Sequence, residues 1–463
     1  MCGVIAVLGS TDITRSMELL AHRGIRSDVM PTSAGTVGHV RLPIVGLDAE
    51  HDQPVMCVGW TIGFVGELLD FREHCPGMEC DVDLVAITWA TDGPEGFRKF
   101  DGFWGIAAIH NTDRTLHVLT DYLGQKPMYY RADVPSAASE PDALVPLGPV
   151  TLDEVYLSAV IKWGYCPDLV RTPYSEIRHV LPGEYVIIRA PYTVDRYFTD
   201  PIVPVPYHQP DTDIRKEIEA AVKRRVLSSD VQTACLVSGG LDSAIVYTLA
   251  KRHGQPVPYF VSESEADPEY WEALGVVRGT AKAFSYEPMV PRIEQNLRRS
   301  LWSEVTVQEA LAIMQEPIDL GSLRPQIALS RAVRERVCLT GDGADELFGG
   351  YQRSQRYDSQ NSDVFQELPA WHLPRLDRVM MRQRIEVRSP FLARRVVQMA
   401  LSLPHEMRQD KRYLRGIFGD VLPPRICEKP KKALRVSEIE RDREGYSAHL
   451  VHLFREKFNA KTT

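Results

Sequence analysis

TACLVSGGLDS, residues 233–243, joins a short apolar run to two glycines and the start of a helical pattern. The apolar run predicts a buried strand, and the spacing of apolar residues from Ala244 onward predicts a helix. Glycines let backbone N–H groups approach a phosphate, and the N-terminus of a helix adds positive partial charge. Because no Lys follows the glycines, this is not a loop of the kind that transfers a γ-phosphate. The stretch predicts an α/β fold with a phosphate-binding loop, which we favour over a purely structural glycine turn.

A second glycine-rich loop, TGDGADELFGGY at residues 340–351, follows the apolar run at residues 336–339. It carries three carboxylates within five residues, and such groups repel one another unless a cation lies among them. This composition is unusual for an ordinary connection between a strand and a helix. The loop therefore predicts a cation site beside the phosphate-binding loop.

The two parts of the chain have different patterns. After residue 213, short apolar runs alternate with helical periodicity, which predicts a parallel sheet buried on both faces. Before residue 198, β-rich runs separated by turn residues are typical of stacked antiparallel sheets, with helices at 14–22 and 83–90 covering them. Four prolines between residues 201 and 210 deny the intervening segment a helix. We predict domains at 1–200 and 213–463, joined by a linker at 201–212.

Charge and cysteine content exclude several classes of protein. The 463 residues include 54 Lys and Arg against 62 Asp and Glu, a net charge of −8, which argues against a nucleic-acid binder. No apolar stretch is long enough to span a bilayer. The eight cysteines form no C-x-x-C pair, which indicates free thiols in a reducing compartment. We expect a cytoplasmic protein without nucleic-acid or membrane partners.

Cys2 would become the N-terminal residue after removal of the initiator methionine. It would then carry a thiol nucleophile and, on the same residue, an α-amine that titrates near ~8 and can act as a base. Taken alone, a cysteine at this position is more often an accident, because short motifs match by chance.

Cys2 is followed along the chain by a series of short motifs. In order, they are CGV at 2–4, AHRG at 21–24, RLPIV at 41–45, Gly66-Glu67, Cys80-Asp81 and DYLGQKPMYY at 121–130. Together they resemble the glutaminase domain of the N-terminal-nucleophile (class II) glutamine amidotransferases over residues 1–195. The resemblance implies an αββα sandwich. It also implies that Cys2 attacks the side-chain amide of glutamine, forming a thioester and releasing ammonia.

The same resemblance implies roles for four further residues. Arg41 would bind the α-carboxylate of glutamine, for which a planar guanidinium is suited. Asp81, helped by Glu67, would bind the α-ammonium, and the backbone N–H of Gly66 would stabilise the oxyanion. The family has Asn where this chain has Val65, so one oxyanion donor is missing, a loss that typically costs ~10²–10³ in kcat. We expect slow glutamine turnover unless a neighbouring group replaces that donor.

The Ser-Gly-Gly-x-Asp-Ser pattern resembles the PP-loop of ATP pyrophosphatases, whose fold is a parallel α/β sheet. The acidic loop, EPID at 316–319, EVRSPFL at 386–392 and the basic run at 429–432 extend a resemblance to glutamine-dependent asparagine synthetases through about residue 435. The resemblance implies that Asp242 and Asp345 bind Mg²⁺ at the phosphates of ATP. It places Lys431 at the adenylated intermediate and Arg324 near the acceptor carboxylates, although a solvated basic run and a surface ion pair are the alternatives for these two. The remaining nucleotide-binding positions would be Leu236, Ser238, Gly239, Gly240, Ser243, Val261, Thr340 and Gly341.

The sequence leaves open which carboxylate accepts the ammonia. Asp342 replaces the Glu of asparagine synthetases, and a change of one methylene shifts preference by only ~1–3 kcal/mol. We favour amidation of the aspartate β-carboxylate with glutamine-derived ammonia, and the family also implies a homodimer. One alternative is an amide ligase for a different carboxylate, or one dependent mainly on free ammonia. A non-catalytic scaffold is disfavoured by the two intact loops.

Overall fold

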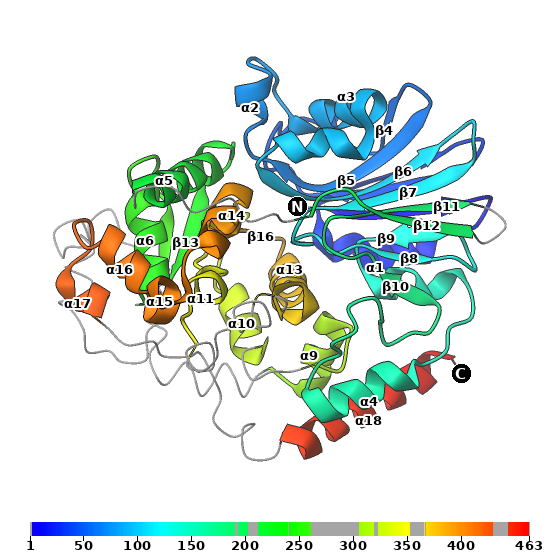
Figure 1. Cartoon of the computed structure of the whole chain (residues 1–463). Helices are drawn as coiled ribbons and strands as arrows, with labels where there is room; N and C mark the ends of the chain where they lie inside the picture. Colours follow the sequence, from blue (N-terminus) through cyan, green and yellow to red (C-terminus); the bar gives the residue numbers. More distant parts are fainter. Residues whose placement is uncertain are drawn as a thin grey trace.

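The computed structural model describes residues 2–189, 193–201, 212–238, 240–260, 305–318, 323–351, 365, 367–428 and 443–462. Two six-stranded antiparallel sheets form the first part of the chain and stack face to face (Figure 1). The first sheet contains, in spatial order, β10 (Ile177–His179), β8 (Tyr129–Arg131), β9 (Ser136–Ala138), β1 (Gly3–Leu8), β3 (Gly35–Arg41) and β2 (Arg26–Pro31). The second contains β12 (Thr193–Phe198), β11 (Glu184–Arg189), β7 (Thr115–Thr120), β6 (Gly102–His110), β5 (Trp60–Leu68) and β4 (Val55–Cys57).

Helices cover the outer faces of this sandwich. One apolar cluster between the sheets includes Val4, Val37, Val65 and Ala107, all fully buried. The outer face of the second sheet packs against α3 (Asp81–Asp92), and α1 (Thr14–Leu20) packs on the first sheet (Figure 1). The remaining helices here are α2 (Phe71–His74) and α4 (Glu154–Trp163). The predicted αββα arrangement is confirmed.

A four-stranded parallel sheet organises the second part of the chain. Its order is β14 (Val257–Phe260), β13 (Thr233–Val237), β15 (Val337–Leu339) and β16 (Glu386–Arg388). β13, β14 and β15 are mostly apolar because helices bury both faces of the sheet. The helices are α5 (Thr212–Leu227), α6 (Leu241–Ala250), α9 (Val307–Met314), α10 (Leu323–Ser330), α11 (Ala344–Leu347), α13 (Leu373–Met381), α14 (Arg394–Ser402), α15 (His405–Arg408), α16 (Arg412–Ile417), α17 (Pro424–Glu428) and α18 (Arg443–Thr462). The predicted parallel α/β fold is confirmed.

The last helix returns to the first part of the chain. In Figure 1, α18 lies alongside α4. Arg455 Nη1 donates to Glu154 Oε1 at 2.7 Å, and Phe454 and Phe458 lie against the ring of Tyr174. The C-terminal helix of the second part of the chain therefore packs against the first part.

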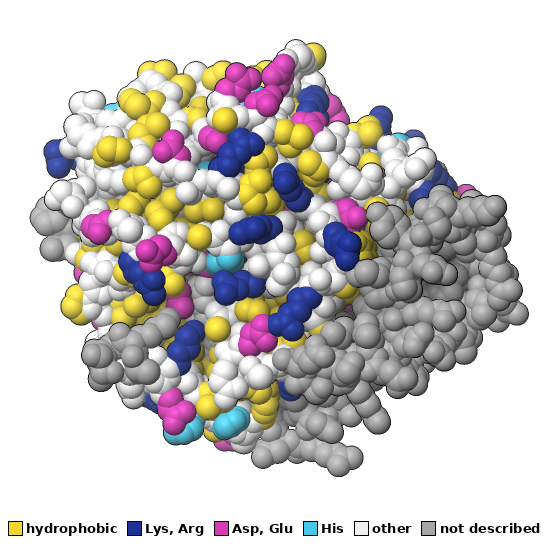
Figure 2. Space-filling model, turned by 180° about the vertical axis from the view of Figure 1, so that it is seen from behind, with side chains coloured by type: hydrophobic (Ala, Val, Ile, Leu, Met, Phe, Trp, Pro, Cys, Tyr) yellow, Lys and Arg dark blue, Asp and Glu magenta, His cyan; other side chains and the backbone are white. Residues whose placement is uncertain are grey.

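Basic and acidic side chains alternate over the described part of the face in Figure 2, interspersed with apolar and neutral ones. None of the described helices is long and apolar enough to cross a membrane. All eight cysteines are free thiols, as predicted.

Candidate active sites and the hollow between them

The register of the first sheet places Cys2 beside Arg41. Gly3 pairs with Val40, so the residue before β1 lies next to the residue that ends β3. Cys2 is 7% exposed, and burial raises the pKa of its thiol above the ordinary value. The guanidinium of Arg41 acts in the opposite direction and partly offsets this effect.

The guanidinium of Arg41 is held by the loop that follows it. Its Nη1 donates to Asp48 O and to Asp52 Oδ1, both at 2.8 Å. Its Nη2 donates to Val45 O at 3.0 Å and also to Gly46 O. Loop 45–52 therefore fixes the position of Arg41, and a carboxylate ligand would have to share these N–H groups.

The end of β5 and the start of α3 form the opposite side of the site. Gly66 has φ +130°, and a Cβ there would lie 2.0 Å from Phe103 O, so only glycine fits at this position. Asp81 begins α3, two residues earlier than predicted, and its Oδ2 accepts from Leu68 N at 2.9 Å. This hydrogen bond ties the helix to the strand that carries Gly66.

Two buried carboxylates in this site have raised pKa values. Burial raises the pKa of Asp81 to about 6 and the pKa of Glu67 well above its usual range, and repulsion from Glu386 adds to both shifts. Glu67 Oε2 is buried without a hydrogen-bond partner, and its nearest cation, Arg388 Nη2, is 3.6 Å away. Two buried carboxylates short of positive charge are suited to binding an ammonium group.

Val65 lies in the apolar cluster between the sheets and is fully buried. Its side chain carries no hydrogen-bond donor. The position at which the glutaminase family has Asn therefore contributes nothing to an oxyanion, and slow turnover stays a prediction.

Two residues of β16 belong to this site and were not assigned a role from the sequence. Arg388 is fully buried and donates from Nε to Glu386 Oε1 at 2.6 Å. Its Nη1 donates to Arg225 O and to Ser228 Oγ, both at 2.8 Å. A signal was available, because EVRSPFL at 386–392 was already part of the resemblance and its charged residues need partners when they are buried. Through Glu386 and Arg388 the parallel sheet contributes charge to the site around Cys2.

The phosphate-loop prediction is supported by the local geometry around α6. Gly240 is extended and precedes α6, which begins at Leu241, three residues earlier than predicted. The Ser243 hydroxyl accepts from Ser238 N at 3.0 Å and lies 3.1 Å from Gly240 O, so the loop is closed on itself. The first N–H groups of α6 remain available to an anion at this end of the helix.

The acidic loop adjoins the phosphate loop. A Cβ on Gly341 would lie 2.9 Å from the Cβ of Asp242, so the two loops touch. Lys411, 3% exposed, places its Nζ 2.5 Å from Asp345 Oδ1 and donates to Asp242 Oδ2. A Cβ on Gly350 would lie 1.9 Å from Asp345 Oδ1, so glycine is required to admit this pair. The two predicted metal ligands thus converge on one lysine.

Lys411, which contacts both predicted metal ligands, was not singled out from the sequence. It lies at the start of α16 with φ +56°, a backbone conformation that its sequence context does not reveal. The sequence prediction assigned a lysine of the basic run instead, Lys431, and this position lies outside the described residues together with Gly239 and Val261.

Four other residues predicted to bind the nucleotide or the acceptor lie among the described residues. Thr340 N donates to Arg388 O at 3.1 Å, and Asp342 O accepts from Ser389 Oγ. Leu236 is half-buried on β13. Arg324 donates from Nε to Val305 O at 2.8 Å, a contact that does not join it to either loop.

A small hollow lies at the junction of the two parts of the chain. One wall includes Phe103, whose carbonyl adjoins Gly66, and the other includes Ser389, which is bonded to Asp342. Its lining residues are Phe103, Gln125, Lys126, Leu373, Leu376, Asp377, Val387, Ser389 and Leu392. Both parts of the chain therefore build this space.

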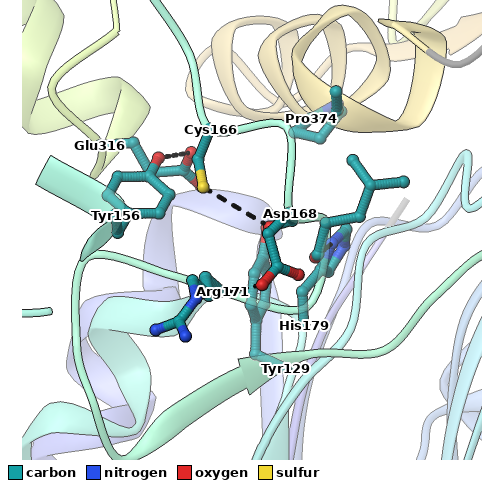
Figure 3. Close-up of a pocket in the computed structure, with 10 residues that line it drawn as sticks. Tyr129, Tyr156, Cys166, Asp168, Arg171, His179, Glu316 and Pro374 are labelled. Carbon is teal, nitrogen blue, oxygen red and sulfur yellow. Dashed lines mark hydrogen bonds and ion pairs between the residues drawn. The ribbon is translucent and has the colours of Figure 1, made fainter. Parts of the chain in front are cut away.

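A second hollow, also at the junction of the two parts, is lined by none of the predicted site residues (Figure 3). Glu316 lies at its edge, where Oε2 accepts from Tyr156 at 2.7 Å and Oε1 pairs with Arg378 at 2.8 Å. Tyr129 and His179 stack at another side of it. These buried polar contacts hold the two parts together.

Comparisons with known proteins agree with this division of the chain. The asparagine synthase family profile matches residues 213–375 and 363–462, and the glutamine amidotransferase domain profile matches residues 1–198. The chain belongs to the asparagine synthase family. It is 25% identical to a glutamine-hydrolysing asparagine synthetase of Brassica oleracea, over 96% of this chain and 79% of the relative. It is 24% identical to asparagine synthetase B of Escherichia coli (strain K12), over 90% of this chain and 77% of the relative.

Among solved structures, a glutamine phosphoribosylpyrophosphate amidotransferase from B. subtilis matches with 15% identity and a TM-score of 0.32, covering 78% of this chain and 79% of that one. No argument rests on a likeness at this level.

Proposed function

We propose that this protein is an ATP-dependent amide ligase. It adenylates a carboxylate, for which the β-carboxylate of aspartate is our choice, and amidates it with ammonia from glutamine. The products are asparagine, AMP, diphosphate and glutamate. The observation that carries the proposal is the hollow built by both parts of the chain, whose lining includes Phe103, next to Gly66, and Ser389, which donates to Asp342 O.

In the first site, the Cys2 thiol adds to the side-chain amide carbon of glutamine while the α-amine of Cys2 takes the proton. The C–N bond then breaks, ammonia leaves with that proton, and water later hydrolyses the thioester to glutamate. Glu67 and Asp81 bind the α-ammonium of glutamine, and Arg41 binds the α-carboxylate. The buried carboxylates support this role because their pKa values are raised and Glu67 Oε2 has no hydrogen-bond partner.

In the second site, the acceptor carboxylate attacks the α-phosphorus of ATP and the bond to diphosphate breaks. Ammonia then attacks the acyl carbon of the adenylate, and AMP leaves. The N–H groups at the start of α6 would bind the diphosphate. Lys431 is our choice for stabilising charge on the adenylate, and Arg324 for binding the acceptor.

Asp242 and Asp345 are the proposed ligands of Mg²⁺. Their fit rests on two observations: both converge on Lys411, and Asp242 Oδ1 is buried without a hydrogen-bond partner. Bound there, Mg²⁺ would neutralise charge on the phosphates. Lys411 holds the two carboxylates together until the metal and nucleotide bind.

The hollow supports transfer of ammonia without release to solvent, where it would be protonated. A bulky residue in its wall should uncouple the sites. We expect Val387→Trp to retain glutamate formation while asparagine formation from glutamine falls at least tenfold.

A second acceptor remains the alternative, because Asp342 is one methylene shorter than the family Glu. The proposed domain boundaries are 1–200 and 213–463. The eight free thiols support a cytoplasmic location, and a homodimer stays a prediction that light scattering would test.

The test incubates the purified chain with Mg-ATP and aspartate, with either glutamine or ammonium, and follows asparagine, AMP and glutamate. We expect asparagine and AMP in equal amounts with either nitrogen source. Cys2→Ala should abolish the reaction with glutamine and leave the reaction with ammonium. AMP release only when another acid replaces aspartate would transfer the assignment to the alternative acceptor.

A further inference from the structure

A histidine and two glutamates gather at the rim of the Cys2 site, on residues that the proposed reaction does not use. They are Glu50 and His51 of a short 3-10 turn (Ala49–His51) and Glu79, two residues before α3. One ligand atom from each lies within 4.8 Å of the others. His51 Nε2 is 3.8 Å from a carboxylate oxygen of each glutamate.

The imidazole of His51 gives the second observation that points to a ligand. His51 is 9% exposed, and its Nε2 is buried without a hydrogen-bond partner. An unsatisfied buried ring nitrogen is costly, and a bound cation would satisfy it. The two glutamates are 70% and 74% exposed, so their carboxylates can move toward a shared ion.

The chemistry of the three ligands selects the class of ion. In a tetrahedral Zn²⁺ site the ligand atoms lie ~3.4 Å apart, so the observed 3.8 Å needs only a small closure. Imidazole nitrogen favours first-row transition ions over Mg²⁺ and Ca²⁺. Asp83 Oδ2 is 4.0 Å from His51 Nδ1, where a carboxylate can orient a metal-binding imidazole. Two carboxylates would neutralise a divalent ion.

We propose that Glu50, His51 and Glu79 bind a divalent transition-metal ion, with water completing its coordination. This site is independent of the proposed ligase reaction. The ion would tie loop 45–52, which holds Arg41, to the segment that leads into Asp81. The metal would therefore act as a clip across the rim of the glutamine pocket.

The test titrates the full chain, in a Cys2→Ala background that removes the most reactive thiol, with Co²⁺ and Zn²⁺. We expect one saturable site and a cobalt spectrum without a sulfur-to-cobalt charge-transfer band. Glu50→Gln with Glu79→Gln should weaken binding at least tenfold. The matched control, Glu18→Gln with Asp113→Asn, removes two exposed carboxylates elsewhere and should leave binding unchanged.

Hydrogen exchange gives a readout of the clip itself. Zn²⁺ should slow exchange of the amides in loop 45–52 in the Cys2→Ala protein and not in the variant lacking both glutamates. Equal metal affinity in the two proteins, a sulfur-to-cobalt band, competition by equimolar Mg²⁺, or unchanged exchange in the loop would each overturn the proposal.

Discussion

Both candidate sites gather buried carboxylates, but only one of them has an internal cation between its carboxylates. Asp242 and Asp345 share the ammonium of Lys411. Among the described residues, Glu67 forms an ion pair with Arg388, at 3.6 Å, and that guanidinium is also bound to Glu386. Burial, together with repulsion from Glu386, raises the pKa of Glu67 and of Asp81.

This difference indicates where each site obtains its positive charge. The first site is incomplete until a ligand brings an ammonium group, so binding glutamine relieves an electrostatic cost already present in the fold. In the second site Lys411 occupies the position between the carboxylates, and an arriving metal ion must displace or share it. Removing one partner of a buried charged group is strongly destabilising, which makes the two sites respond differently to the same kind of substitution.

The largest effect is expected from Asp242→Asn. The amide cannot supply the charge that a metal ion and ATP phosphates require, so ATP-dependent diphosphate release should fall ~10³-fold. Glutamate formation from glutamine should continue, because the change is confined to the second site. Asp113→Asn, an exposed carboxylate, serves as the control. Unchanged diphosphate release would show that the phosphate loop had been misassigned.

The second-largest effect is expected from Val65→Asn, which tests whether the first site lacks a hydrogen-bond donor for the oxyanion. Val65→Asn should raise steady-state glutaminase activity ~10²-fold, the value of one oxyanion donor. It should also lower the free energy of unfolding by about 1–3 kcal/mol, because Val65 is fully buried among apolar side chains. Val65→Ala controls for the loss of packing without a donor. Equal glutaminase rates for wild type and Val65→Asn would mean that another group already serves as donor.

The fold could be predicted because each part depends on a local pattern. Alternating β-rich runs specified the antiparallel sandwich, and continuous apolar runs specified the parallel sheet. The helix starts differed from the prediction: α3 begins at Asp81, whose side chain is held by Leu68 N, and α6 begins directly after Gly240. The return of α18 onto α4 could not be foreseen, because it joins residues about 300 apart through surface contacts.

The sites were predicted unequally. Cys2, Arg41, Glu67 and Asp81 were predicted as site residues because they stand in short motifs, and the sheet register places Cys2 beside Arg41. Lys411 and Arg388 were missed because their roles arise from contacts with distant residues rather than from a local pattern. The balance of positive and negative charge in either site could not be inferred from the sequence, because it depends on which side chains the fold brings together.

Asp81→Asn should weaken glutamine binding and stabilise the free protein. The KM for glutamine should rise ~30-fold through loss of one carboxylate facing the ammonium group. The wild-type pKa of about 6 exceeds the unfolded value of ~3.9, so folding takes up a proton between these pH values. Stability of the wild type therefore falls as pH rises from 4 to 6, and the variant avoids this loss.

Chemical denaturation at two pH values tests this sign. At pH 8 the variant should be more stable than wild type by about 2 kcal/mol, and below pH 4 the advantage should vanish. Asp83→Asn, two residues later and 57% exposed, is the matched control. A variant that is less stable than wild type at pH 8 would contradict the raised pKa.

The smallest effect is expected from Lys411→Gln. The glutamine amide can still donate to Asp242 and Asp345 but carries no charge, so the two carboxylates repel until Mg²⁺ binds. Because the metal replaces the missing charge, the KM for Mg-ATP should rise only ~10-fold, and higher Mg²⁺ should recover part of the loss. The Mg²⁺ dependence of diphosphate release measures this recovery. Lys251→Gln, on the exposed end of α6, is the control. If Lys411 only stabilised the fold, added Mg²⁺ would leave the raised KM for Mg-ATP unchanged. That result would contradict the idea that Lys411 supplies the positive charge between Asp242 and Asp345 before the metal binds.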